Sequence, residues 1–201
     1  MITFLHGQLA EALPTHVVVD VNGVGYEALI PLSSYDRLPA PGQSVTLLTQ
    51  LVVREDAHTL YGFMTPEERD LFRLLIHTVS GIGPKIALNI LSGISVTAFR
   101  GAVANGDVKA LSQISGVGKK TAERMIVELR DKIGMAGAWE ASSAKRGLSA
   151  DEQRINDAVL ALVALGFKQA EAHDAVRQAQ SVLGAQTSVE ELVRACLRKG
   201  T

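Results

Sequence analysis

An eight-residue motif that occurs twice in this 201-residue chain restricts its fold more than any other feature. The motif reads SGIGPKIA at residues 80–87 and SGVGKKTA at residues 115–122, and five of its eight positions are identical. Glycine adopts at little cost the left-handed backbone that a tight turn between two helices needs. The repeat therefore predicts two helix–hairpin–helix units of one design, packed as a pair.

Each predicted hairpin is suited to holding a phosphate. A helix that begins after such a turn presents free N–H groups and the positive end of its dipole to an anion. Lys85, Lys119 and Lys120 add positive charge beside the turns, while Ile82 and Val117 would point inward. None of these groups would reach a base edge, so the predicted contact is with the nucleic-acid backbone and is independent of sequence. The predicted DNA-binding residues are Ser80, Gly81, Gly83, Lys85, Ser115, Gly116, Gly118, Lys119, Lys120, Thr121 and Arg124.

Other interpretations of the glycines are weaker. A single Gly-x-Gly turn fits an ordinary helix end, and it is the repetition in register that favours phosphate binding. In the segment at Gly118, Gly118-Lys119 is followed by Lys120 where a P-loop has Ser or Thr, and the earlier glycine of a P-loop is missing. The Gly23–Gly25 pair lies in a strand-like stretch without the third glycine of a dinucleotide fingerprint. We therefore expect no nucleotide site and no cofactor.

Charge is divided along the chain, although the formal net charge is only −1. Residues 1–63 carry 2 basic and 6 acidic side chains, residues 64–134 carry 10 and 7, and residues 135–201 carry 8 and 8. The segment with the repeated motif is therefore the only basic one, as expected of the part that meets nucleic acid.

The first 63 residues predict a small β domain. Predicted strands cover residues 17–21, 24–30, 44–54 and 58–63. Asn22-Gly23 signals a type I′ hairpin between the first two of these strands. Several short strands in so few residues are typical of a five-stranded, OB-like barrel, so the chain as a whole is α+β and multidomain.

Residues 64–134 predict the tandem helix-hairpin-helix domain. Thr65 can cap the first helix, and Glu68 would complete a capping box. Asn105-Gly106 would end one helix, and Asp107 would begin the next. The longest helix of this domain is predicted to run from Gly118 to Ile133, closed by the following glycine.

The end of the chain predicts a tethered helical module. Residues 135–150 are rich in Ala, Ser and Gly and predict a flexible linker. Residues 151–201 predict three short amphipathic helices. A small helical domain on a tether usually binds a partner protein, and the alternative is a packed C-terminal subdomain. The candidate partner-binding residues are Leu162, Leu165 and Phe167.

Glu55 and Asp56 lie between the last two predicted strands, at a hairpin tip that would face solvent. They have three interpretations: a solvated polar turn, a metal-binding carboxylate pair for hydrolysis, or a charged tip that repels DNA backbone. His58 is the only further metal-ligand candidate close by in the sequence. The repulsion would be screened by salt beyond about 8 Å, so such a tip could steer or split strands at one defined point.

Several classes of protein are disfavoured by composition. Cys196 is the only cysteine, which excludes an internal disulfide and a cysteine-based zinc site. No apolar run approaches the roughly 18 residues that span a membrane, and no secretory signal is recognisable. A cytoplasmic location without membrane attachment is the expectation.

Together these features resemble the RuvA family, the Holliday-junction-binding subunits of the bacterial branch-migration machine, along the whole chain. The matching stretches are GVGYE at 23–27, VVREDA at 52–57, LYGF at 60–63, SGIGPK at 80–85, GVGKKTAER at 116–124 and ALVALGF at 161–167. The linker and most of the last domain match only loosely.

The resemblance implies a specific role in DNA recombination, DNA repair and the SOS response to DNA damage. RuvA-like proteins form homotetramers, sometimes paired as octamers, which hold a four-way junction open and nearly flat. It implies that the hairpins grip the duplex arms and that Glu55 and Asp56 form an acidic pin at the crossover. The third domain would recruit RuvB, a hexameric ATPase motor, and RuvC, a resolving nuclease, could join. The chain itself would not be catalytic.

An enzyme is the rival interpretation, because helix-hairpin-helix pairs also occur in nucleases, glycosylases and ligases. An enzyme would need a cluster of catalytic side chains. The five histidines are scattered along the sequence, and no carboxylate cluster or glycosylase-like Lys/Asp pair is recognisable.

Overall fold

The computed structural model describes residues 1–130, 150–167, 169–184 and 187–199. The chain forms two compact units, Met1–Ala136 and Gly137–Thr201. The predicted linker, residues 135–150, lies outside the described residues except for its last residue, which begins a helix.

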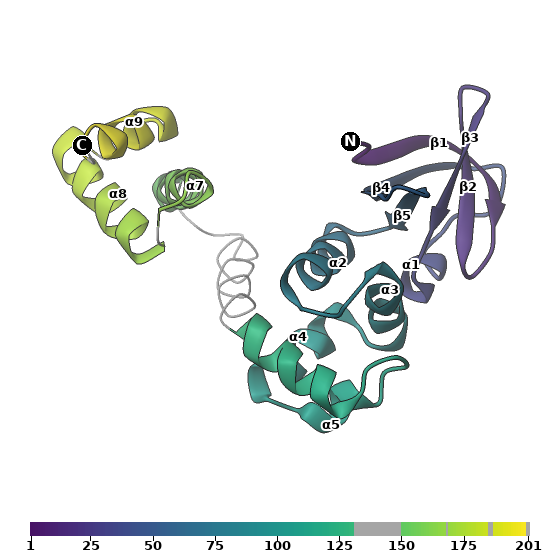
Figure 1. The fold of residues 1–201 in the computed structure, drawn as a ribbon. Helices are drawn as coiled ribbons and strands as arrows, with labels where there is room; N and C mark the ends of the chain where they lie inside the picture. The colour runs from purple at the N-terminus through teal and green to yellow at the C-terminus, as the bar shows by residue number, and fades with distance from the viewer. Residues whose placement is uncertain (131–149, 168, 185–186, 200–201) are drawn as a thin grey trace. The chain divides into compact units, whose positions relative to one another are not determined.

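Five strands of the first unit close into a barrel in the order β1-β2-β3-β5-β4 (Figure 1). The strands are β1 (Phe4–Ala12), β2 (His16–Val21), β3 (Val24–Leu29), β4 (Ser44–Val53) and β5 (His58–Phe63). All neighbours are antiparallel except β3 and β5, which pair in parallel at Leu29 and Tyr61. The core inside the barrel is aliphatic, with Leu9, Val17 and Leu47 among its buried side chains. The predicted five-stranded, OB-like barrel is confirmed.

The turn between β2 and β3 has the predicted conformation. Asn22 has φ 53° and Gly23 has φ 86°, the two positive values that a type I′ turn requires. Asp20 fixes this turn, because its carboxylate accepts a hydrogen bond of 2.7 Å from the Gly23 N–H.

The first strand had no recognisable pattern in the sequence, and its inward positions explain why. The inward positions are Leu5, Gly7 and Leu9. A glycine therefore takes the place of the apolar side chain that would complete the strand's alternation of inward apolar and outward polar residues. A Cβ on Gly7 would overlap the carbonyl group of Asp20 on the neighbouring strand. The close approach of two backbones therefore removes the sequence signal.

The helical part of the first unit follows the barrel directly. Its helices are α2 (Pro66–Thr78), α3 (Pro84–Gly93), α4 (Val96–Asn105), α5 (Val108–Ser112) and a helix that includes residues 119–130. Three predicted helix termini are confirmed. Thr65 caps the start of α2, where its hydroxyl accepts from the Glu68 N–H, and Asp107 caps the start of α5, where it accepts from the Ala110 N–H at 2.9 Å. Gly106 ends α4 with φ 69°. A second apolar core fills the space between these helices, centred on buried Phe72, Phe99 and Met125. Figure 1 shows α2 and α3 next to the barrel, with α4 and α5 beyond them.

A one-turn helix, α1 (Leu32–Tyr35), links the barrel to the helices. The buried Ser34 hydroxyl donates to Glu68 Oε2 at 2.8 Å and accepts from the Met64 N–H at 3.0 Å. The Leu32 N–H donates to the Ser92 hydroxyl at 3.0 Å. The predicted capping box is thus only half right, because the described contacts of the Glu68 carboxylate lead to Ser34 and not back to the Thr65 N–H.

A second set of contacts joins α2 to the barrel wall. The Phe72 ring lies 4.9 Å from the Tyr61 ring and 5.0 Å from the Phe63 ring, between centroids. Arg73 Nε donates to Gln50 Oε1 at 2.6 Å. Strand β5 therefore contributes side chains to both cores, and the barrel and the helices form one packed body.

The second unit is a three-helix module made of α7 (Ala150–Ala164), α8 (Gln169–Leu183) and α9 (Val189–Lys199), as predicted. Its core holds Leu162, Val176 and Leu192. A capping box begins α9, since Glu191 Oε2 accepts from the Ser188 N–H at 3.1 Å and the Ser188 hydroxyl accepts from the Glu191 N–H at 3.3 Å.

Across the described ranges, no single helix is long and apolar enough to cross a membrane. The helices α3 and α4 meet that test only together, across a break at which they are bent by 99°.

Candidate nucleic-acid interface

The two copies of the motif fold into the same turn. Gly81 has φ +85° and Gly116 has φ +86°. The Ile82 N–H donates to the Val79 carbonyl at 3.1 Å, and the Val117 N–H donates to the Ile114 carbonyl at 3.0 Å. A positive φ at the third residue of a four-residue turn is typical of type II turns and favours glycine. The repeat in the sequence is therefore a repeat in backbone geometry.

The apolar residue of each turn anchors it from below. Ile82 and Val117 are each only 4% exposed and belong to the helical core, which confirms that they point inward. Their burial leaves the preceding Ser and Gly of each turn exposed at the surface. Each hairpin is thus fixed to the core by one side chain and presents its backbone outward.

The second glycine of each motif has a different role from the first. Gly83 caps α3 with φ −93°, and neither it nor Gly118 has a positive φ. A Cβ on either residue would meet no described protein atom within 4 Å. Neither backbone strain nor protein packing therefore requires glycine at these two positions. The close approach of an external group to the start of the helix would require it, because a side chain there would stand in the way.

The three lysines of the two motifs lie at the surface, beside the turns, as predicted. Lys85, Lys119 and Lys120 are exposed in the first turns of their helices. In the described part of the chain, none of the three forms an ion pair. Thr121 is half-buried, and the other predicted contacts are exposed apart from the half-buried Gly83. All eleven predicted DNA-binding residues are therefore accessible to some degree.

Arg124 has a partner within the protein. Its Nη1 donates to the Ser80 carbonyl of the first hairpin at 2.7 Å, although Arg124 itself follows the second hairpin. Glu128, one turn further along that helix, accepts from the Ser80 N–H at 3.1 Å. The sequence alone does not single out Glu128, because a glutamate four positions after an arginine on one helix usually forms an ordinary solvated pair with it.

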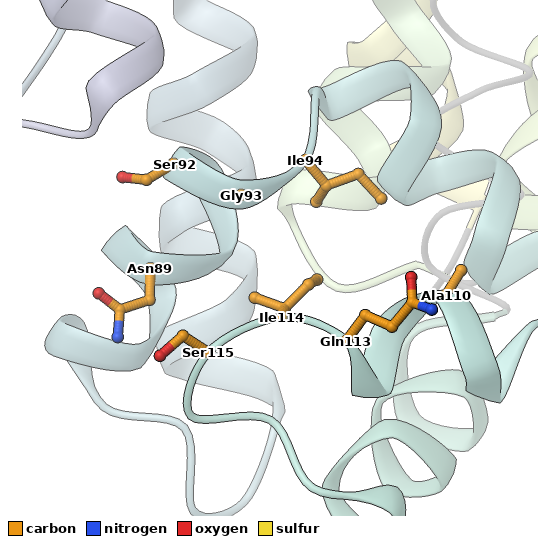
Figure 2. A pocket seen from close by; sticks show the side chains of 8 residues that line it. All are labelled: Asn89, Ser92, Gly93, Ile94, Ala110, Gln113, Ile114 and Ser115. Atoms are coloured by element: carbon orange, nitrogen blue, oxygen red, sulfur yellow. The ribbon is translucent and has the colours of Figure 1, made fainter.

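A shallow hollow of about 430 Å³ lies beside the second hairpin. Figure 2 shows Asn89, Ser92 and Gly93 on one side of it, with Ile114 and Ser115 on the facing segment. The hollow therefore lies between the C-terminal end of α3 and the segment that leads into the second turn.

Glu55 and Asp56 occupy the exposed tip of the β4–β5 hairpin. The Arg54 N–H donates to the Ala57 carbonyl at 2.9 Å and closes the turn around them. Burial raises the pKa of the nearby Tyr61 hydroxyl, and the positive charge of Arg54 partly offsets that rise. Among the described residues, no group of three or more His, Cys, Asp or Glu side chains is arranged to hold a metal ion.

The three candidate partner-binding residues of the second unit differ in accessibility. Leu165 is 59% exposed, and Phe167 is half-buried against the core of the three-helix module. Leu162 is fully buried in that core, so its assignment as a partner contact is wrong: the apolar stripe that singled it out is the side of α7 that packs inward.

Models of three families match the chain. These are the RuvA N terminal domain over residues 1–62, the SAM-like helix-hairpin-helix tandem over residues 72–131, and the RuvA C-terminal domain over residues 153–199. Similar proteins include three called Holliday junction branch migration complex subunit RuvA. The protein from Opitutus terrae is 46% identical over 203 residues, covering 98% of this chain and all of the relative. Those from Pseudomonas putida and Chromobacterium violaceum are 47% and 48% identical, each alignment covering 98% of both chains.

Proposed function

The chain belongs to the RuvA family, and on that premise we propose that it binds four-way (Holliday) junction DNA as a subunit of a branch migration complex. The observation that carries this proposal is the pair of hairpins with one backbone geometry, each opening a helix beside exposed lysines. The chain is a non-catalytic DNA-binding subunit, and the ATP-driven motor of such a complex is a separate, RuvB-type chain. The work of the complex is branch migration in recombination and repair.

We assign the grip on DNA to the hairpins of residues 64–134. Backbone amides, a helix start and lysine side chains offer contacts to phosphates and none to base edges, so binding is independent of sequence. Each hairpin carries its own set of these groups, which suits two neighbouring points on the backbone of one duplex arm. The predicted contacts are the ten motif residues given above and Arg124, which would reach DNA through the part of its guanidinium that Ser80 leaves unused.

We assign the exposed tip of residues 1–63 to the junction centre. Two carboxylates on a tight turn repel phosphates, and their repulsion acts over about 8 Å in physiological salt. Glu55 and Asp56 would thus keep the strands apart at the crossover instead of binding them.

A homotetramer around this centre, or two tetramers paired as an octamer, would give four arms equivalent grips. We propose that residues 151–201 recruit the RuvB-type ATPase through a surface that includes Leu165 and Phe167, and that a RuvC-type resolvase acts on the same junction. We propose a cytoplasmic location, because the proposed substrate is DNA.

The test compares a four-way junction with linear duplex of the same sequence and length, in the presence of Mg²⁺. We expect tight, sequence-independent binding of the junction, weaker binding of the duplex, and intact DNA in both cases. Molar mass with and without the junction gives the number of subunits. Cleavage or base release by the pure protein would instead support the helix-hairpin-helix enzyme, and equal affinity for duplex and junction would refute junction recognition.

A further inference from the structure

Both backbone polar groups of one residue in the first hairpin are held by the helix of the second. Arg124 Nη1 donates to the Ser80 carbonyl at 2.7 Å, and Glu128 Oε2 accepts from the Ser80 N–H at 3.1 Å. Ser80 directly precedes the glycine with positive φ, so its two peptide groups set the orientation of the turn. We call this pair of contacts the Ser80 brace.

The sequence repeat shows where a matching brace would lie at the second hairpin. The two motifs are 35 residues apart, so Arg124 corresponds to Asn89 and Glu128 corresponds to Gly93. The first correspondence holds in space: a Cβ on Gly81 would lie 3.4 Å from Arg124 Nη1, and a Cβ on Gly116 would lie 3.7 Å from Asn89 Nδ2.

The second correspondence fails, because Gly93 has no side chain. The hollow in Figure 2 is lined by Gly93, Asn89 and Ser115, so it lies where a counterpart of the Glu128 carboxylate would stand. Among the described contacts, none joins a side chain of α3 to the backbone of Ser115. The two hairpins thus share a geometry but differ in what holds them.

We propose that Glu128 and Arg124 are positioning residues that fix the first hairpin in its binding conformation, while the second hairpin is left freer to adjust. The part of this inference that concerns DNA rests on the proposed function. A turn whose amide and carbonyl are already bound loses less conformational freedom when a phosphate docks on it. A turn without such contacts can follow the differing backbone positions of a junction arm, and it carries two lysines where the first carries one.

The alternative is that Glu128 acts only through its charge, which would repel DNA. Glutamine separates the two roles, because its side-chain oxygen still accepts from the Ser80 N–H but carries no charge. If only the charge matters, Glu128→Gln and Glu128→Ala strengthen DNA binding alike. If the hydrogen bond matters, only Glu128→Ala loosens the first hairpin.

The first readout is made without DNA, by hydrogen–deuterium exchange of the full chain at short labelling times. A peptide that begins at least two residues before Ser80 and covers residues 80–83 reports the first hairpin, and a peptide that begins at least two residues before Ser115 and covers residues 115–118 is the internal reference. We expect about tenfold faster exchange of the Ser80 amide in Glu128→Ala, little change in Glu128→Gln, and no change in the reference peptide. Equal exchange in Glu128→Ala and the unmodified chain would overturn the brace.

A transplant tests the same idea in the opposite direction. The double variant Asn89→Arg/Gly93→Glu supplies both missing groups, and Gly93 tolerates a side chain because its φ is not positive and the nearest atom to a Cβ is a methyl of Ile114 at 3.6 Å. We expect slower exchange in residues 115–118 and a higher affinity for short duplex. Unaltered exchange there would contradict the inference.

Junction affinity is the second readout. Weaker binding by Glu128→Ala but not by Glu128→Gln supports positioning, and equally stronger binding by both variants overturns it. If exchange changes as expected while neither variant affects DNA binding, the brace stands as a structural device and the proposed DNA contact of the first hairpin fails.

Discussion

Replacement of Lys119 and Lys120 by alanine tests the phosphate grip most directly. Both side chains are exposed at the start of the helix that follows Gly118, and in the described part of the chain neither is engaged by a carboxylate. Their charge is therefore available to DNA in the free protein. Because alanine favours helix as strongly as lysine does, the double variant should fold normally.

The size of the effect follows from counterion release. Each lysine that neutralises one phosphate of B-DNA contributes about 0.9 to the slope of log affinity against log salt. The loss of both should flatten this slope by about 1.8 for each subunit whose second hairpin is engaged. Between about 50 and 200 mM salt, affinity falls for both proteins, and the factor by which it falls should therefore be roughly twelvefold smaller for the double variant than for the unmodified chain.

The assay is a salt titration of binding to a duplex of about one helical turn (~10 bp), which limits engagement to a single arm, followed by the four-way junction. Two unrelated sequences should give the same change in slope. The control Arg37→Ala/Lys109→Ala removes two exposed charges outside both hairpins and should alter the slope less. An unchanged slope and an unchanged junction affinity in the Lys119/Lys120 variant would refute the phosphate grip.

Three further perturbations address other parts of the molecule. Glu55→Gln with Asp56→Asn should preserve or tighten junction binding but disturb strand separation, measured by a fluorescent base at the crossover, and a loss of binding would instead indicate a metal or structural role. Ser34→Ala removes the donor to the buried Glu68 carboxylate and should destabilise the first unit by about 1–3 kcal/mol in urea unfolding, whereas an unchanged midpoint would contradict the interpretation of α1 as a link. Hydrogen bonds from Ser188 lower the pKa of Glu191 below its ordinary value of 4.5, so the stabilisation by its carboxylate is complete above that pH and is lost as the pH falls through the lowered pKa. Glu191→Gln should remove this acid-side loss from the thermal unfolding of the three-helix module, and identical acid profiles would show that the cap does not contribute.

Local signals predicted much of the fold. The type I′ turn at Asn22-Gly23 and the caps at Thr65 and Asp107 depend on residues within three positions of one another, and the sequence contains all the information they need. The two hairpins were predictable because their motif is repeated, and the exposure of Glu55 and Asp56 followed from the strands on both sides.

Contacts between distant residues were not predictable in the same way. Ser34 and Glu68 meet across 34 positions, and the capping pattern around Thr65 offered the Glu68 carboxylate a nearer but incorrect partner. Leu162 was misassigned because an apolar stripe does not say whether it faces its own core or a partner.

The Ser80 brace also has a signal in the sequence, at positions outside the repeated motif. Comparison of the two repeats at positions beyond the motif pairs Arg124 with Asn89 and Glu128 with Gly93. Differences between repeats, and not only their identities, indicated that the two hairpins are supported differently.

The open space in front of Gly83 and Gly118 has a consequence for how variation in this chain is interpreted. Alanine at either position meets no described neighbour, so such variants should fold, express and pass any selection for stability. The same change at Gly81 or Gly116 is strained by their positive φ and should be eliminated by that selection. In a survey of tolerated substitutions, selection for stability alone would therefore show that the first glycine of each motif is required. The requirement for the second glycine would show only under selection for DNA binding.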